Sequence, residues 1–283
     1  WTGTGILKRV DVVSTNNSYS RASGRTDCVA ATCTYTEELQ NFANWYGYYR
    51  TRMLMMKSAT TLAFTQLDGN YRVGFDNICQ ATGTTVDNPV AQFEGAGRSY
   101  WWTSLTNASP NCATPLRAET AKIGQYYARK LNTTQADPME YSCQQNYMLL
   151  VTDGYWNETE SSAIKGVSGA DIGNTDNALA TAARPYYDGA QVSTSCPAVG
   201  GSRGSTAYSC RTLADIAFHY YSTDLRTNAL GNATNTLLGR DVATNNVLTT
   251  ADDKNQAQHM NFFAMGLGID GKLGFSSDYQ TSG

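Results

Sequence analysis

The sequence predicts an α/β fold in which helices flank a largely parallel sheet. Apolar runs of strand length alternate along the chain with segments whose apolar residues recur every three or four positions. The run at residues 147–151 also stops abruptly at Thr152-Asp153-Gly154, as a buried strand does where it reaches the ligand-binding edge of an open α/β sheet. Since no internal repeat and no convincing linker interrupts the chain, we expect residues 1–283 to form a single domain.

The N-terminal third is predicted to contain one strand and one long helix. Residues 6–14 show the partial alternation of a strand, and a loop bounded by cysteines follows. Residues 36–64 carry the strongest helical pattern, and their apolar stripe is expected to pack on the sheet rather than to bind a cofactor. The stripe consists of Trp45, Tyr49, Met53 and Met56.

The rest of the chain continues the alternation, with one long insertion. The expected elements are a short strand at 71–75, an exposed Gly-rich region around 99–103, a helix at 114–131, a strand at 146–152, an insertion at 158–211, a helix at 212–221 and a strand at 260–268. Thr114 stands at the N-cap position of the second helix and Pro115 at its first helical position.

Composition points to an extracellular or envelope protein. Only 16% of the residues are charged, while 18 Tyr and five Trp are present. A net charge of −3 without a Lys/Arg cluster argues against nucleic-acid binding, and no run reaches the roughly 18 apolar residues of a membrane span. The chain begins without Met or a signal-like apolar core, so we expect it to be a processed or excised piece.

Seven cysteines without a CxxC pair indicate disulfides formed in an oxidising compartment rather than structural zinc. The sequence alone leaves the connectivity open. The pairs expected from proximity and context are Cys28–Cys33, Cys112–Cys143 and Cys196–Cys210, with Cys79 left free or bonded outside this sequence.

A set of motifs in fixed order resembles a known family. The most specific are NFANWYGYYRTRM at 41–53, TPLR at 114–117 and TDGYWN at 152–157. Together they resemble the von Willebrand factor A-like domain of the PilY-type proteins found at the tips of bacterial type IV pili. Further segments that carry the resemblance are 33–40, 71–75, 142–146, 212–215, 221–226 and 259–268.

The resemblance implies a metal-ion-dependent adhesion site at the carboxyl edge of the sheet. Thr114 matches its second element and Asp153 its third, and the implied ion is Mg²⁺ or Mn²⁺, with Ca²⁺ as an alternative. The first element, an Asp-x-Ser-x-Ser loop, is absent from this sequence. We therefore expect either that the first central strand comes from residues outside it or that the sheet is rearranged, and we expect the missing ligands to come from residues outside it. The alternative roles are a helix cap for Thr114 and a turn carboxylate for Asp153.

The resemblance implies the N-terminal module of a pilus-tip protein that acts outside the cell, at the pilus tip or bacterial surface, in adhesion and in pilus assembly or mechanosensing. Its implied partners are minor pilins, the tip complex and a host-cell or abiotic surface ligand. One alternative is a metal-free scaffold that binds minor pilins, which the absent loop favours. The other is a secreted hydrolase, but GxSxG, HExxH and P-loop motifs are missing, so we expect no enzymatic activity and no catalytic residue. The hydrolase candidates would be Asp153, Asp215, His219 and His259, with Cys79 as a nucleophile that lacks an identified partner.

Overall fold

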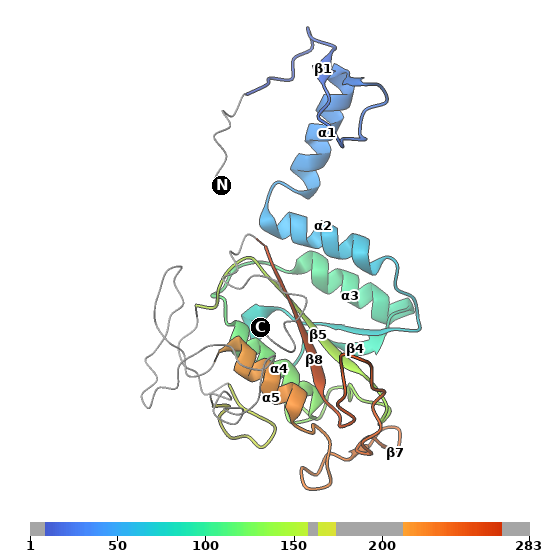
Figure 1. The fold of residues 1–283 in the computed structure, drawn as a ribbon, viewed down its shortest axis with the longest axis vertical. Helices are drawn as coiled ribbons and strands as arrows, with labels where there is room; N and C mark the ends of the chain where they lie inside the picture. Colours follow the sequence, from blue (N-terminus) through green and yellow to red (C-terminus); the bar gives the residue numbers. More distant parts are fainter. Residues whose placement is uncertain (1–8, 158–163, 174–211, 268–283) are drawn as a thin grey trace. The chain divides into compact units, whose positions relative to one another are not determined.

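The structure is a computed structural model that describes residues 9–157, 164–173 and 212–267. The chain divides into two compact units, Trp1–Phe64 and Thr65–Gly283, which we call unit 1 and unit 2. Figure 1 shows the elements of each unit in the colours of the sequence. The expectation of one domain stays a prediction.

Unit 1 contains a short antiparallel pair closed by a disulfide. Strand β1 (Tyr19–Ser20) pairs with β2 (Thr32–Cys33), and Cys28 is bonded to Cys33, as predicted. Tyr19 and both cysteines are buried, and Tyr35 packs against them. The core of this unit is therefore small.

The strand predicted at 6–14 is wrong for its described part. Residues 9–14 have no strand structure, and residues 6–8 lie outside the described residues. The backbone N–H of Val13 donates to the Tyr19 hydroxyl at 2.8 Å, and that hydroxyl donates back to the Val13 carbonyl at 3.0 Å. A side chain thus takes the hydrogen bonds that a neighbouring strand would have made.

The single helix predicted at 36–64 is in fact two helices, α1 (Tyr35–Tyr48) and α2 (Arg52–Phe64). Helix α1 begins at a capping box formed by Thr34 and Glu37. The helical structure is interrupted between them. The Thr51 hydroxyl accepts the backbone N–H of Leu54 at 3.1 Å and so caps the start of α2.

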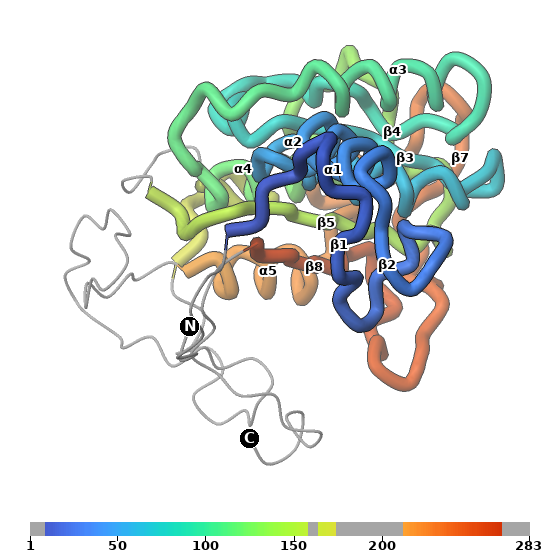
Figure 2. The backbone as a smooth tube through the Cα atoms, turned by 90° about the horizontal axis from the view of Figure 1, so that it is seen from above, coloured from blue at the N-terminus to red at the C-terminus, as the bar shows by residue number. Residues whose placement is uncertain are grey.

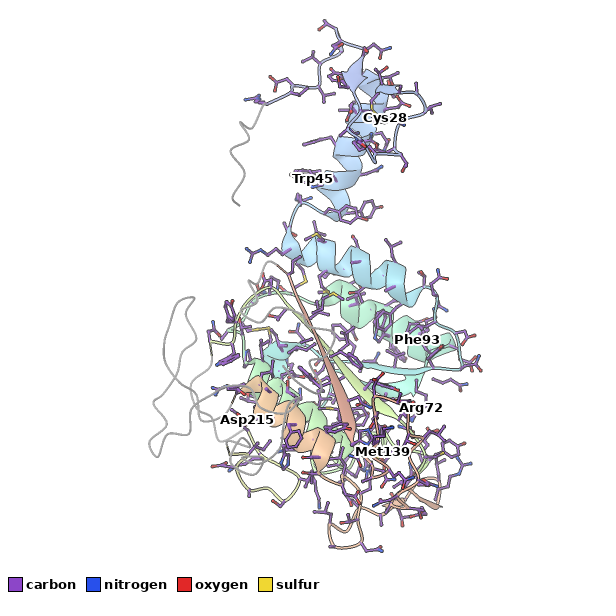
Figure 3. All side chains as sticks on the ribbon, viewed as in Figure 1. Cys28, Trp45, Arg72, Phe93, Met139 and Asp215 are labelled. Atoms are coloured by element: carbon purple, nitrogen blue, oxygen red, sulfur yellow. A yellow bond between two sulfur atoms is a disulfide. The ribbon has the colours of Figure 1, made fainter. Side chains whose placement is uncertain are left out.

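The expected burial of the apolar stripe is also wrong on α1. Trp45, labelled on α1 in Figure 3, is 50% exposed, and Tyr49 is 40% exposed. Neither α1 nor α2 contains a buried residue. Met53 and Met56 on α2 are half-buried.

The centre of unit 2 is a parallel strand pair. Strand β5 (Asn146–Thr152) pairs with β8 (Met260–Gly266) over the whole length of both strands, and Figure 2 shows them side by side. Both strands were predicted. Because Asn146 pairs with Met260 and Thr152 with Gly266, the carboxyl ends of the two strands meet at one edge.

Helices α4 (Leu116–Tyr127) and α5 (Leu213–Ser222) contribute to the core beside this pair, where α4 packs on α5 and α5 packs on β8. They confirm the helices predicted at 114–131 and 212–221, although α4 ends earlier, before Arg129 at φ +56°. The core includes Leu116, Ala121, Met148, Leu150, Ile216, Tyr220 and Met260. The opposite face of the pair leaves Tyr147, Leu149, Phe263 and Met265 about half exposed.

The other sheets of unit 2 are two-stranded and antiparallel. They are β3 (Arg72–Phe75) with β4 (Asn88–Gln92), and β6 (Thr234–Asn235) with β7 (Arg240–Asp241). The strand expected at 71–75 is confirmed, while β4, β6 and β7 were not predicted. The described residues thus form a mixture of helices and small sheets, and the von Willebrand factor A-like architecture stays a prediction.

The loop expected around 99–103 is wrong, because helix α3 (Gly95–Asn107) occupies it, whereas the expected exposure holds for Ser99, Tyr100 and Thr103. Trp101 is 2% exposed, lies edge-on against Phe93, and donates its indole N–H to the Gly74 carbonyl at 3.1 Å. One of the glycines that suggested a loop, Gly97, serves close packing, because a Cβ there would lie 2.4 Å from the Gln92 carbonyl oxygen.

The predicted Cys112–Cys143 disulfide is wrong. Cys112 is bonded to Cys79, and Cys143 is free and exposed. The short helix η1 (Ile78–Gln80) brings Cys79 to the loop before α4, with 5.4 Å between the two Cα atoms. The Cys196–Cys210 pair and most of the 158–211 insertion lie outside the described residues.

Of the helices that the structure does describe, none has the length and apolar character needed to cross a membrane.

Candidate functional site

Helix α4 brings Thr114 to the carboxyl end of the strand pair without using it as a cap. The helix starts at Leu116, and its N-cap residue is Pro115, which makes no side-chain capping bond. The predicted cap role of Thr114 is therefore wrong. Thr114 is half-buried, and within the described parts of the chain its hydroxyl has no hydrogen-bond partner.

Asp153 lies in the turn that follows β5 and is exposed. The Thr152 hydroxyl shapes this turn, since it donates to the Gly154 carbonyl at 3.1 Å and accepts the Gly154 backbone N–H at 3.3 Å. The turn therefore presents the carboxylate at the edge where the strands end.

Asn157 joins the two segments. Its Oδ1 accepts the backbone N–H of Thr114, and its own backbone N–H donates to the Thr114 carbonyl at 3.2 Å. The structure thus brings the Thr114 loop to the turn that carries Asp153. We call Thr114, Asp153 and Asn157 the strand-end edge.

A buried, positively charged side chain, that of Arg117, lies next to this edge. Arg117 is 0% exposed, and its guanidinium lies 5.7 Å from the centre of the Trp156 ring. Trp156 belongs to the same turn as Asp153 and packs against the core of unit 2. The contact between Trp156 and Arg117 therefore holds this turn to α4.

The strand-end edge fits a divalent cation in chemistry but not in number of ligands. The Asp153 carboxylate and the Thr114 hydroxyl are hard oxygen donors of the kind that Mg²⁺ and Ca²⁺ prefer. Over the described ranges, the only clustered group of three or more His, Cys, Asp or Glu side chains is Cys28, Cys33 and Glu38, where both sulfurs are already in a disulfide. The described residues alone do not complete a metal centre.

Sequence reasoning missed a second group of polar side chains, buried where β3, η1 and α4 meet. Lys122 Nζ lies 2.6 Å from Asp76 Oδ2, 3.9 Å from Glu119 Oε2, and donates to the Gln80 carbonyl at 2.9 Å. All three charged side chains are at most 5% exposed. In sequence Glu119 and Lys122 look like an ordinary i,i+3 ion pair on a solvated helix face, so nothing in the pattern signalled burial.

Glu119 is protonated at neutral pH in this setting. Burial and, to a lesser extent, the negative charge of Asp76 raise its pKa from 4.5 to about 9, against the opposing effect of Lys122. A carboxylate at this position would have two buried oxygens without a hydrogen bond, whereas a carboxylic acid can donate to Asp76. The group is inaccessible, so we assign it a structural role.

Three of the hydrolase candidates, Asp215, His259 and Cys79, have structural roles. Asp215, labelled in Figure 3, caps α5 together with Thr212. His259 is buried, with Nε2 2.9 Å from Asp253 Oδ2 and Nδ1 2.6 Å from the Ala257 carbonyl. Burial lowers the pKa of His219, whose ring lies edge-on to Tyr220. Cys79 is in a disulfide and is not an available nucleophile.

Three curated proteins named type IV pilus biogenesis factor PilY1, from strains of Pseudomonas aeruginosa, are similar to this chain. The protein of strain PAO1 is 33% identical over an alignment of 273 positions, which covers 88% of this chain and 22% of that protein. For strain PAK the identity is 30% over an alignment of 293 positions, gaps included, which covers 94% of this chain and 23% of that protein. For strain UCBPP-PA14 it is 28% over 271 positions, which cover 90% of this chain and 21% of that protein.

No family model and no solved structure matches the chain. The similarity supports the resemblance to the pilus proteins and leaves their von Willebrand factor A-like fold untested. Because the chain spans only about a fifth of the length of these relatives, their activity as whole proteins does not transfer to it directly. Most of this chain is homologous to a segment of the PilY1 type IV pilus biogenesis factors.

Proposed function

We propose that this chain is a module of a type IV pilus-tip protein that acts in surface or host adhesion and in pilus assembly or mechanosensing. The homology to pilus biogenesis factors over 88% of the chain supports a role in the pilus. The adhesive role rests on the strand-end edge. We further propose that the module works outside the cell, with minor pilins and the tip complex as partners.

The observation that carries the adhesive role is the pair of hydrogen bonds between Thr114 and Asn157. These bonds bring a hydroxyl and a carboxylate-bearing turn to one edge of a parallel strand pair, where α/β proteins commonly bind ligands. The ligand proposed for this edge is an acidic oxygen of a host-cell or abiotic surface, bound through a divalent cation.

The cation would be Mg²⁺ or Mn²⁺, with Ca²⁺ as the alternative. Thr114 and Asp153 would hold it, and it would supply a positively charged, open coordination position for the acidic oxygen. Further oxygen donors must come from residues other than these two.

The second candidate function is a metal-free scaffold at the pilus tip. It is supported by the incomplete donor set and by the apolar side of the strand pair, where Tyr147, Leu149, Phe263 and Met265 are about half exposed. Exposed apolar patches of this kind mark contacts with other proteins. A secreted hydrolase is the weakest candidate, because Asp215 and His259 already have structural partners.

Calorimetric titration with Mg²⁺ and Mn²⁺ tests the proposal, on this chain and on one extended upstream. Binding by the extended chain that Asp153→Ala abolishes would support the strand-end edge. The matched control is Asp68→Ala, because Asp68 is another exposed turn carboxylate that precedes a glycine and accepts a local backbone N–H. Absence of binding by either chain would leave the scaffold as the better account, and the melting temperature would then not respond to the ions.

A further inference from the structure

The loop that carries Thr114 is attached on both sides of the residue. It connects the end of α3 to the start of α4, and Cys112 within it is bonded to Cys79. Two residues later, Thr114 exchanges two hydrogen bonds with Asn157, which is 43 positions further along the chain. One attachment is covalent and the other is a hydrogen-bonded pair.

We infer that Asn157 and the Cys79–Cys112 disulfide are positioning groups that fix Thr114 relative to the Asp153 turn. The inference rests on the proposed function for its biological meaning. Neither group needs to touch the ligand or the ion. Their role is to keep the hydroxyl of Thr114 and the carboxylate of Asp153 at a constant separation.

The side chain of Asn157 is the decisive part of the hydrogen-bonded pair. Its backbone N–H donates to the Thr114 carbonyl at 3.2 Å, and alone this bond would let the loop pivot. The second bond, from the Thr114 N–H to Asn157 Oδ1, runs in the opposite direction and closes a ring. Two antiparallel bonds fix orientation as well as distance, as they do between the paired residues of a sheet.

Asn157, the residue to which Thr114 is hydrogen-bonded, is itself held in place. Asn157 follows Trp156, which packs on the core and lies over the buried Arg117 of α4. The turn from Asp153 to Asn157 is thus held to α4 by a large aromatic contact. A loop attached to Asn157 is therefore attached to the rigid part of unit 2.

The Cys79–Cys112 disulfide likewise holds the Thr114 loop, at a point that precedes Thr114 in the chain. Cys79 lies in η1, and Lys122 of α4 donates to the carbonyl of the adjacent Gln80 at 2.9 Å. The covalent tether from Cys112 consequently ends on an element that is bonded to α4. Binding sites need ligand groups held to within about 0.5 Å, which loops achieve only with such supporting contacts.

Amide hydrogen exchange of Thr114 in the full chain, followed by NMR, tests the role of Asn157. In Asn157→Leu we expect exchange of the Thr114 amide to accelerate by about tenfold, the scale of one lost hydrogen bond. Asn157→Asp keeps an acceptor oxygen in the same place and should restore slow exchange. Unchanged exchange in Asn157→Leu, or failure of Asn157→Asp to rescue it, would overturn the inference for Asn157.

Asn132→Leu is the matched control, because Asn132 also accepts a backbone N–H on Oδ1, from the nearby Thr134. It should leave exchange of the Thr114 amide unchanged, and a tenfold rise would indicate a general loosening that contradicts a local role. The double variant Cys79→Ser/Cys112→Ser should accelerate the same amide and add to the effect of Asn157→Leu. No acceleration would overturn the role of the disulfide.

Mn²⁺ titration of the upstream-extended chain separates this inference from the proposed function. If the extended chain binds Mn²⁺, Asn157→Leu should weaken binding and Asn157→Asp should recover it, while an unchanged affinity in Asn157→Leu would overturn the positioning role. If the extended chain does not bind Mn²⁺, the proposed adhesion site fails, whereas the exchange of the Thr114 amide still decides whether Asn157 fixes the loop.

Discussion

Helix α1 of unit 1 is more exposed than its sequence suggests, whereas helix α4 of unit 2 is more buried. The aromatic stripe of α1 predicted burial, yet the helix has no buried residue. Helix α4 carries Arg117, Glu119 and Lys122, which suggest a solvated face, yet ten of its twelve residues are buried. The pattern of a helix shows which face can be buried, whereas the elements around it decide how much of it is buried.

Burying charge on all sides of a helix requires a partner for each charge, and α4 has them. Arg117 lies under the Trp156 ring, and Lys122 lies between Asp76 and the Gln80 carbonyl. Glu119 keeps its proton and so avoids a buried negative charge. On α1 the charged residues stay near water, so their pairs have little desolvation to offset. The two units should therefore respond differently to matched substitutions.

The largest difference is expected for the arginine–carboxylate pairs. Arg226 is fully buried, bonds both carboxylate oxygens of Asp137 and donates to the Tyr127 carbonyl at 2.8 Å. Arg226→Ala should lower the free energy of unfolding of unit 2 by about 3–5 kcal/mol, because the only positively charged group it leaves near the buried Asp137 carboxylate is Arg129 at 3.9 Å, beside the Met139 backbone N–H. Urea unfolding of the full chain measures this loss.

The counterpart in unit 1 is Arg25, which is paired with Glu38 at 2.9 Å near the surface. Arg25→Ala should cost unit 1 only ~0–1 kcal/mol, since water screens the pair and solvates the remaining carboxylate. Losses of equal size in the two units would contradict the comparison.

Glycine substitutions should give effects of opposite sign in the two helices. In α4, a Cβ at Gly124 would lie 2.4 Å from the ring of Tyr220 on α5, so Gly124→Ala should destabilise unit 2 by about 1–3 kcal/mol. In α1, a Cβ at Gly47 meets nothing within 4 Å, so Gly47→Ala should stabilise unit 1 by about 0.5–1 kcal/mol through helix propensity. Thermal unfolding of both variants checks the signs; destabilisation by Gly47→Ala would mean that α1 is covered at that position.

The elements that sequence reasoning predicted share strong local signals. Strands β5 and β8 are apolar runs of strand length, and α5 combines helical periodicity with a capping box at Thr212. The adjacency of Thr114 and the Asp153 turn came from the family resemblance, and the hydrogen bonds of Asn157 agree with it.

The misses share a dependence on contacts between distant parts of the chain. Helix α3 was mistaken for a loop because its packing depends on Trp101, which donates to the Gly74 carbonyl 27 positions away. The Cys79–Cys112 bond depends on how η1 folds back toward α4, and spacing along the chain favoured another pair. The burial of Glu119 and the role of Asn157 likewise depend on partners more than 40 positions away.

The pH dependence of stability should also differ between the units. Folding raises the pKa of Glu119 from 4.5 to about 9, so between these values the folded chain holds a proton that the unfolded chain has lost. The free energy of unfolding of unit 2 should therefore fall as the pH rises through this range, by up to about 1.4 kcal/mol per pH unit for one proton. Urea unfolding at pH 5.5, 7 and 8.5 measures the slope, and Glu119→Gln should flatten it.

Unit 1 supplies the contrasting case in Glu37. Hydrogen bonds from the backbone N–H groups of Thr34 and Val29 lower the pKa of this carboxyl, so its contribution is present above its unfolded pKa and is lost as the pH falls through the folded value. Between pH 5.5 and 8.5 it adds no slope. A decline of unit 2 that persists in Glu119→Gln would show that another group carries the effect.

The smallest effect is expected for the aromatic face of α1, and it tests the comparison most directly. Trp45 is half exposed, so Trp45→Ala should change the free energy of unfolding by less than about 0.5 kcal/mol. Trp101 of α3 is 2% exposed and hydrogen-bonded to Gly74, and Trp101→Ala should cost unit 2 about 3–5 kcal/mol, which makes it the matched control. If Trp45→Ala proves as costly as Trp101→Ala, then another part of the folded protein covers the stripe, and the burial predicted from its periodicity would be correct after all.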